Sequence, residues 1–169
     1  MAEQGRIHSL VVMGVSGSGK STIGKLLAEK TGFSFTDADD LHPPANKAQM
    51  AAGIPLTDES RIPWLRIIGE LFRNAEQKNK KNIVACSALK RSYRDLLREY
   101  SPELFFVFLD GTKVEIQERL WSRNHEFMPA SLLDSQFANL EPLQGDEEGI
   151  KIAIRGTPEQ LVREIQEAL

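Results

Sequence analysis

The segment GVSGSGKS at residues 14–21 constrains the fold of this chain more than any other stretch. A glycine, four residues, a second glycine, a lysine and a serine form the spacing of the phosphate-binding loop. The segment follows an apolar run at residues 7–13 and precedes the helical spacing of Ile23, Leu26 and Leu27. A strand, this loop and a helix in that order are the context in which the pattern binds phosphate.

The glycines let backbone N–H groups point inward at a phosphate, and the helix that follows adds the positive end of its dipole. We expect ATP as the ligand, with Lys20 on its β- and γ-phosphates as a catalytic residue and the Ser21 hydroxyl on Mg²⁺. A glycine-rich turn without a ligand is the alternative. The predicted nucleotide-binding residues of the loop are Gly14, Val15, Ser16, Gly17, Ser18, Gly19, Lys20, Ser21 and Thr22.

Apolar runs alternate with helical patterns along the rest of the chain. Strand-like runs occupy residues 33–36, 83–86, 104–109 and 150–154. This alternation predicts an α/β fold of three layers, with a central parallel sheet of about five strands covered by helices on both faces. A chain of 169 residues without a linker suits one domain spanning residues 1–169.

Several helices carry their own signals. Thr157 and Gln160 form a capping box at the start of the last predicted helix, and Pro158 takes its first position. Trp64 and Met50 are assigned to the core.

Two segments depart from plain alternation. The first covers about residues 40–80 and contains two helical patterns, and the second covers about residues 123–140. Insertions at the carboxyl ends of parallel strands are where such folds bind substrates and place lids. We therefore expect a helical substrate-binding insertion and a lid.

Composition argues against several classes of protein. A net charge of −3 argues against a general nucleic-acid binder, because such proteins carry a basic excess. The apolar runs are too short for a membrane span or a signal peptide, so we expect a cytoplasmic protein. Cys86 is the only cysteine and reads as a small buried hydrophobe, with a catalytic thiol as the alternative.

A phosphate-binding loop serves kinases, GTPases and ATP-driven machines alike, so the class must come from other residues. The segments beginning at Asn46 and Asn79 lack the aspartate of a guanine-reading Asn-Lys-x-Asp element. DEEG, which begins at Asp146, follows no strand and is interpreted as a solvated loop. Strand-coupled ATPases usually have a larger core and often a basic groove, and this chain shows neither. A small-molecule kinase is the class that remains.

The acidic segment DADDLHP follows the second predicted strand. In phosphoryl transfer to an alcohol, one carboxylate can hold Mg²⁺ through water and another can deprotonate the attacking hydroxyl. Asp37 and Asp39 lie two apart, so an extended backbone would turn both to one face, and we assign Asp37 to the metal and Asp39 to the hydroxyl. Helix capping by Asp39 or Asp40 is the alternative, and Asp110 competes for the metal role.

The chain resembles the gluconokinases of the thermoresistant type, P-loop enzymes related to shikimate and nucleoside-monophosphate kinases. The segments that carry the likeness are GVSGSGKS, DADDLHP, NKAQMAAGIPLTDESRIPWL, CSALKRSYRDLLR and FMPASLLDSQFANLEPL. The resemblance implies phosphorylation of D-gluconate by ATP at its 6-hydroxyl, giving 6-phosphogluconate. Another acceptor, such as shikimate or a nucleoside monophosphate, is the first alternative, and a nucleotide-dependent switch without turnover is the second. Family members are often dimers, so a homodimer is one expected assembly.

Gluconate is a small anion rich in hydroxyls, so its site needs cationic donors and further polar groups. Arg61 lies just before Pro63, which predicts that a helix begins or bends there and leaves the guanidinium free to bind a carboxylate. A surface pair with Asp58 or Glu59 is the alternative for this arginine. Lys90, in CSALKR, is the second predicted cation for substrate or phosphate.

Further candidates flank these two cations. His42 and Asn46 are predicted substrate contacts, with a structural hydrogen bond as the simplest interpretation of His42. Arg91 and Arg94 are either site residues or helix surface, and surface is favoured for Arg91.

Arg119 and Arg123 lie four residues apart on one predicted helical face. In relatives of this fold, the first such arginine flanks the adenine and the second reaches the transferring phosphate when the lid closes and excludes water. We therefore expect Arg119 to bind the nucleotide and Arg123 to be catalytic. Solvated arginines paired with Glu115 and Glu118 are the alternative.

The lid departs from the family's pattern at one point. The family commonly has Gly-His before Phe-Met-Pro, whereas this chain has His125 followed by Glu126, so the family's histidine role does not transfer. Gln136 is expected to contact the nucleotide or the lid hinge, and Phe137 to lie in the core. The loop at residues 155–158 is the expected neighbour of adenine, mostly through backbone atoms.

Overall fold

Parallel strands form the centre of the computed structural model, which describes residues 9–124 and 130–169 and the side chains of residues 9–122 and 132–169. Within these residues, one five-stranded sheet has the order β2-β3-β1-β4-β5, and all its neighbouring strands are parallel. The strands are β1 (Ser9–Met13), β2 (Ser34–Asp37), β3 (Asn82–Ala85), β4 (Phe105–Asp110) and β5 (Gly149–Ala153).

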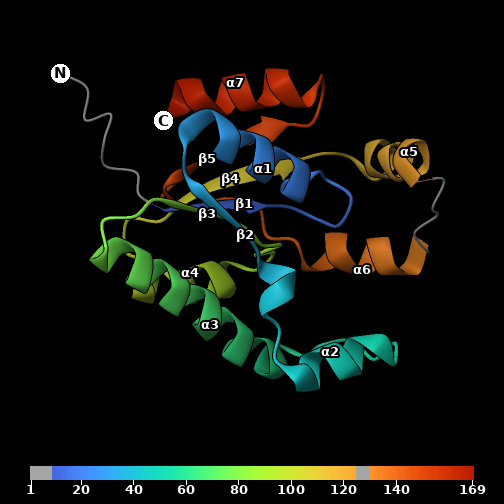
Figure 1. Ribbon diagram of the computed structural model, residues 1–169. Coiled ribbons are helices and arrows are strands. Elements are labelled where there is room, and N and C mark those ends of the chain that lie inside the picture. The colour runs from blue at the N-terminus through green and yellow to red at the C-terminus, as the bar shows by residue number, and fades with distance from the viewer. Residues whose placement is uncertain (1–8, 125–129) are drawn as a thin grey trace.

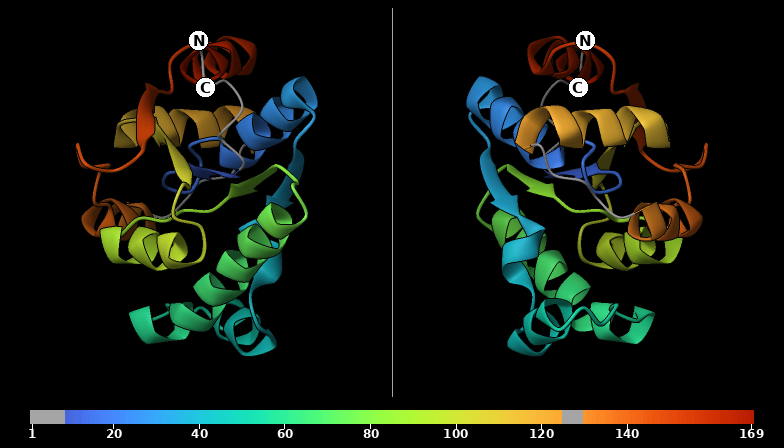
Figure 2. Two further views of the ribbon diagram at one scale, coloured as in Figure 1. Left: turned by 90° about the vertical axis from the view of Figure 1, so that its left-hand side faces the viewer. Right: turned by 90° about the vertical axis from the view of Figure 1, so that its right-hand side faces the viewer.

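Helices cover both faces of this sheet, so the molecule has three layers (Figure 1). The helices are α1 (Lys20–Thr31), α2 (Pro44–Ala51), α3 (Asp58–Gln77), α4 (Arg91–Tyr100), α5 (Lys113–Asn124), α6 (Ala130–Asn139) and α7 (Pro158–Ala168), with a short 3₁₀ helix η1 (Ala38–Leu41). α1 and α7 pack together on one face, and α3 and α4 pack together on the other. α2 lies away from the sheet, beside the amino-terminal end of α3 (Figure 2).

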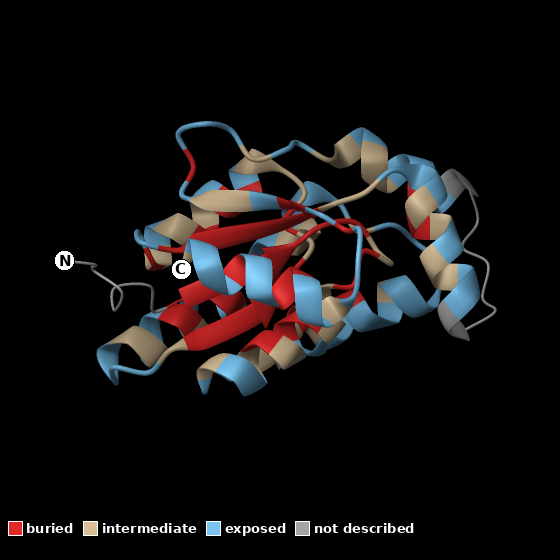
Figure 3. Ribbon diagram, turned by 90° about the horizontal axis from the view of Figure 1, so that it is seen from above, coloured by how far each residue is buried: buried red, intermediate tan, exposed pale blue. Residues whose placement is uncertain are grey.

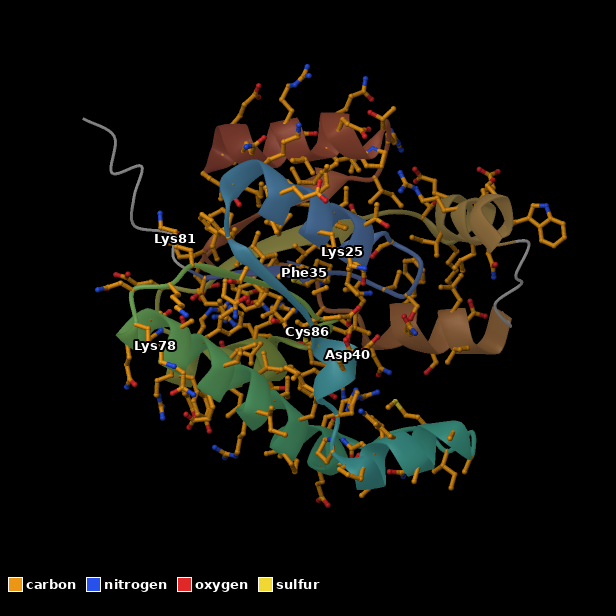
Figure 4. The ribbon with its side chains drawn as sticks, viewed as in Figure 1. Lys25, Phe35, Asp40, Lys78, Lys81 and Cys86 are labelled. Atoms are coloured by element: carbon orange, nitrogen blue, oxygen red, sulfur yellow. The ribbon has the colours of Figure 1, made fainter. Side chains whose placement is uncertain are left out.

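The strands form the core because their side chains alternate between the two faces. Leu10 and Val12 of β1 belong to the cluster under α1 and α7, whereas Val11 and Met13 belong to the cluster under α3 and α4. Figure 3 shows the buried strands between helices whose outer faces are exposed. At the edge of the sheet, α1 packs over β2, and Lys25 Nζ lies 6.0 Å from the ring centre of Phe35 (Figure 4).

The register places the ends of three strands at one level. Val12 pairs with Ala85 of β3, and Asp37 of β2 pairs with the same alanine. The loops that follow β1, β2 and β3 therefore leave the sheet together. α5 and α6 lie toward this same end of the molecule (Figure 1).

The predicted fold class is confirmed, and each predicted strand lies within two residues of an observed one. The capping box of Thr157 and Gln160 and the place of Pro158 are confirmed as well. Of the two alternatives predicted for Pro63, a helix start or a bend, the start is wrong, because α3 begins at Asp58, capped by the reciprocal Thr57 and Ser60 contacts, and Pro63 lies inside it.

The assignment of Met50 to the core is also wrong. This methionine is 42% exposed on α2, which packs mainly through the buried Asn46. Trp64 is buried as predicted. In the part of the chain that the structure describes, no helix combines the length and the apolar character needed to cross a membrane.

Candidate active site

The loop after β1 takes a backbone path that only glycine follows at several positions. Gly14 and Gly17 have φ values of 150° and 84°. A Cβ on Gly14 would lie 2.7 Å from Ser18 Oγ, and one on Gly17 would lie 2.9 Å from Leu120 Cγ. The glycine spacing in the sequence therefore reflects both backbone conformation and close packing.

Lys20 is the first residue of α1, and its side chain turns back over the loop. Its Nζ donates to the Val15 carbonyl at 3.0 Å, so the side chain reaches across the loop. Burial lowers the pKa of Lys20, and the nearby Asp39, Cys86 and Asp37 oppose that shift.

Ser21 meets the end of β2. Its Oγ donates to Asp37 Oδ2 at 2.8 Å, so the predicted metal-binding pair lies together. Asp110 ends β4, and its backbone carbonyl accepts from the Ile154 N–H at 3.0 Å.

These oxygen donors fit Mg²⁺. That ion binds one or two protein oxygens and completes its shell with water and substrate phosphates. A hydroxyl beside a carboxylate next to a phosphate loop is such a donor set. Across the described residues, no group of three or more histidine, cysteine, aspartate or glutamate side chains could hold a metal by itself.

Asp39 reaches the same region by a different backbone path from the one predicted. The chain does not stay extended after Asp37, because η1 begins at Ala38. Asp37 Oδ1 accepts the Asp39 N–H at 3.0 Å and caps η1. The prediction that extended backbone turns Asp37 and Asp39 to one face is therefore wrong, although both carboxylates lie near Lys20. The alternative of helix capping by Asp39 or Asp40 is wrong, because α2 begins after Pro43 without a side-chain cap.

The surroundings of Asp39 suit a proton acceptor. Partial removal from water raises the pKa of its carboxyl above the ordinary aspartate value, and the charge of Asp37 raises it further. Lys20 and His42 oppose this shift with smaller effects. The side chain still reaches solvent, so a substrate hydroxyl can approach it.

The two predicted substrate cations converge between α3 and α4. Arg61 Nη1 donates to the Tyr93 hydroxyl at 3.0 Å, and Lys90 Nζ lies 2.9 Å from Asp58 Oδ1. The Tyr93 hydroxyl in turn donates to Asp58. Tyr93 was not among the predicted site residues, and its position three residues after Lys90, in the first turn of α4, was the available signal.

The segment that carries Lys90 is joined to the phosphate loop. The Gly14 N–H donates to the Ser87 carbonyl at 3.3 Å, so CSALK runs beside the loop after β1. Cys86 directly follows β3 inside the molecule (Figure 4), where burial raises its pKa to about 12. This confirms the interpretation of Cys86 as a buried hydrophobe.

His42 and Asn46 hold η1 against α3. His42 stacks on Trp64 at 4.2 Å between ring centres, and Trp64 Nε1 donates to the Ala38 carbonyl at 2.7 Å. The Asn46 amide donates to the Ser60 carbonyl at 2.9 Å and lies 3.3 Å from His42 Nδ1. Both side chains are buried, which favours the structural interpretation over a substrate contact.

Arg119 lies beside the phosphate loop. Its guanidinium donates to the Ile154 carbonyl, and a Cβ on Gly19 would lie 3.7 Å from it. A hollow of about 530 Å³ opens here, lined by Glu115, Glu118, Arg119, Ser122, Ile154 and Arg155. This is the place expected for adenine. The side chain of Arg123 and the whole of His125 and Glu126 lie outside the described residues.

Gln136 of α6 contacts the phosphate loop with both ends of its amide. Its Oε1 accepts the Ser16 N–H at 2.6 Å, and its Nε2 donates to Ser16 Oγ at 2.8 Å. This helix of the predicted lid segment is thereby joined to the loop. Phe137 was predicted to lie in the core. It is partly buried and packs against the core cluster under α1 and α7.

Arg94 is neither a site residue nor helix surface, contrary to both readings of the sequence. It is fully buried, and its Nε lies 2.7 Å from Glu147 Oε1. The interpretation of DEEG as a solvated loop therefore holds for Asp146, which pairs with Arg91 at 2.6 Å, but not for Glu147.

Comparison with known proteins agrees with the geometry of the site. The shikimate kinase family matches residues 16–169. The thermosensitive gluconokinase of Escherichia coli is 46% identical, with 85% of this chain and 76% of that protein covered. The gluconokinase of Gluconobacter oxydans is 44% identical, with 92% and 88% covered.

Solved structures give the same answer. A gluconokinase from Sinorhizobium meliloti has a TM-score of 0.89 at 46% identity, with 95% of this chain and 90% of that chain covered. The shikimate kinase of Aquifex aeolicus, at 20% identity and a TM-score of 0.60, shares the fold, with 95% and 94% covered.

Proposed function

Because this chain belongs to the gluconokinases, within the shikimate kinase family, we propose that it transfers the γ-phosphate of ATP to the 6-hydroxyl of D-gluconate. The observation that carries this proposal is the hydrogen bond from the Gly14 N–H to the Ser87 carbonyl. It joins the phosphate loop to the segment of Lys90, so a nucleotide phosphate and a carboxylate acceptor would bind within one site.

The acceptor would lie between the cations and Asp39. Lys90 and Arg61 would bind the carboxylate of gluconate, and the extended sugar acid would bring its far hydroxyl toward the phosphate loop. His42 and Asn46 would support this site mainly by fixing η1, which carries Asp39.

The chemical step moves one proton and one phosphoryl group. The 6-hydroxyl oxygen attacks the γ-phosphorus while the bond from that phosphorus to the bridging oxygen breaks, and ADP leaves. Asp39 accepts the hydroxyl proton, since its raised pKa makes it a stronger base than an ordinary aspartate. Lys20 and the loop N–H groups stabilise the charge that develops on the phosphate oxygens.

The remaining roles follow from position. Ser21 and Asp37 would hold Mg²⁺, which neutralises phosphate charge when bound. Arg119 would flank the adenine beside the carbonyl of Ile154. Arg123, the next arginine on α5 and toward the lid, would reach the transferring phosphate. We further propose one domain over residues 1–169, a cytoplasmic location where ATP is supplied, and the homodimer that the family resemblance implies.

An acceptor panel tests the proposal. Steady-state ADP release would be measured with D-gluconate, shikimate and AMP at equal concentrations. We expect turnover with gluconate and none above background with the other two. Turnover of shikimate or AMP without turnover of gluconate would contradict the proposal, and ATP loss that no acceptor stimulates would favour a switch.

A further inference from the structure

Lys90, one of the two cations proposed to bind the substrate, already holds a carboxylate, which belongs to the chain itself. Lys90 Nζ donates to both oxygens of Asp58, at 2.9 Å and 3.1 Å. The Tyr93 hydroxyl donates to the same carboxylate. Arg61 Nη1 donates to the oxygen of that hydroxyl at 3.0 Å. The Lys90 ammonium and the Tyr93 hydroxyl, with the Arg61 guanidinium behind the hydroxyl, therefore form an anion site that the Asp58 carboxylate occupies.

The carboxylate of Asp58 is held in a way that permits exchange. Asp58 is the first residue of α3, and its side chain is 59% exposed, against 25% for Lys90. An ion pair so open to water contributes little free energy, because water competes for both partners. Lys90 is thus the less exposed side of the contact, and Asp58 is the side that can swing away.

We propose that Asp58 is a specificity-determining residue that occupies the carboxylate subsite until a substrate carboxylate displaces it. This inference rests on the proposed function, since it takes Lys90 and Arg61 as the acceptor's cations. An anionic acceptor can replace every contact that Asp58 loses, whereas a neutral polyol leaves Lys90 without a carboxylate. Asp58 therefore lowers the apparent affinity for gluconate, because gluconate can bind only to the fraction of molecules in which Asp58 has moved out of the subsite.

The variant Asp58→Asn tests this directly, with Glu59→Gln as its matched control. Glu59 is also exposed and lies in the first turn of α3, so both variants remove one negative charge from the same helix end. Gluconate binding would be measured by calorimetry, and KM and kcat by steady-state assay. D-glucitol, which has the terminal hydroxyl but no carboxylate, serves as the neutral probe.

We expect Asp58→Asn to tighten gluconate binding and lower its KM by about two- to fivefold, the range of an exposed ion pair, with kcat little changed. Binding of glucitol should not tighten, and Glu59→Gln should match the wild type. In a Lys90→Met background, the gain from Asp58→Asn should shrink, since the contact that it relieves is gone.

Weaker or unchanged gluconate binding in Asp58→Asn would overturn the inference and make Asp58 a support for Lys90 instead. Equal tightening in both single variants would also overturn it, because general electrostatics would then explain the gain. Failure of the wild type to phosphorylate gluconate would overturn the proposed function, and this inference with it. That outcome is visible before any variant is made.

Discussion

Asp39 and Asp37 illustrate how two neighbouring carboxylates acquire different roles. Asp37 accepts hydrogen bonds from the Ser21 hydroxyl and the Asp39 N–H, which hold its carboxylate in place. Asp39 has a raised pKa because it is partly removed from water and lies near the charge of Asp37. A carboxylate held by hydrogen bonds beside a readier proton acceptor is the arrangement that metal binding and proton abstraction require.

Replacing Asp39 with asparagine should lower kcat by about 10²- to 10⁴-fold, because the hydroxyl proton loses its acceptor. A carboxyl accepts a proton only above its own pKa, so activity of the wild type should fall as pH falls through the raised pKa of Asp39. The variant should lose that acid limb. Asp40→Asn, an exposed neighbour, serves as the control and should keep both rate and pH profile. A variant at Asp39 with the wild-type rate would remove this residue from the mechanism.

Sequence reasoning identified these carboxylates but gave a wrong reason for their proximity. A period of two residues assumes extended backbone, and the Asp37 side chain ends the strand by capping η1. Tyr93 was missed because its role depends on Asp58 and Arg61 of another helix, 35 and 32 residues away. Local pattern predicts the residue types of a site, whereas the partners of each side chain depend on tertiary packing.

At the scale of elements, two links between distant segments hold the site in shape. α6 meets the phosphate loop through Gln136, and α4 is fixed to the segment after α6 by the buried pair of Arg94 and Glu147. Arg94 also donates to the Ala88 carbonyl at 2.8 Å. Ala88 has a positive φ of 44°, so this contact holds a strained turn just before Lys90.

Gln136→Ala should raise the KM for ATP by about two- to tenfold, the effect of losing one or two hydrogen bonds that order the loop. The KM for gluconate should change less, because Gln136 contacts Ser16 and not the cations. Ser135→Ala, an exposed position on the same helix, is the control. Nucleotide titration and steady-state kinetics give both constants. An unchanged KM for ATP would show that the loop is ordered without α6.

Glu147→Gln should destabilise the fold by about 3–5 kcal/mol, because it leaves the buried Arg94 with an unpaired charge. Burial alone would raise the pKa of Glu147, but hydrogen bonds from Arg94, the Gln144 N–H and Arg98 outweigh it and lower the pKa to about 2.

Because its pKa is lower in the folded protein, Glu147 stabilises the fold at pH values above its unfolded pKa of about 4.3. This stabilisation is lost as the pH falls toward about 2. The free energy of unfolding of the wild type should therefore fall across this window more steeply than that of Glu147→Gln. Urea denaturation at several pH values measures both, with the exposed Glu148→Gln as control. Parallel curves for wild type and Glu147→Gln would contradict this account.

Apolar periodicity predicted the helices and strands well, but it did not predict the side-chain contacts that join them. Strands and helices appear where apolar spacing placed them, because burial of one face decides each element locally. The start of α3 was missed because its Thr–Ser capping box begins six residues before the more conspicuous Pro63. Arg94 and Glu147 are 53 residues apart, so no local spacing announces their pairing.

At the scale of the whole molecule, strand order assembles the site. β1 lies between β3 and β4, with β2 beyond β3, so the loops after β1, β2 and β3 leave the same end of three adjacent strands. These loops carry the phosphate-binding residues, the acidic pair and Lys90. Alternating strands and helices predicted a parallel sheet, but the order of its strands is set by crossovers that periodicity does not encode.

The central claim is that this assembly phosphorylates the terminal hydroxyl of gluconate. The most direct test is proton-coupled ³¹P NMR of the product formed from ATP and D-gluconate, with Lys20→Ala as the blank. A phosphate ester on the primary 6-hydroxyl couples to two protons and gives a triplet, which is the predicted result. A doublet from an ester on a secondary hydroxyl, or inorganic phosphate alone, would contradict the claim.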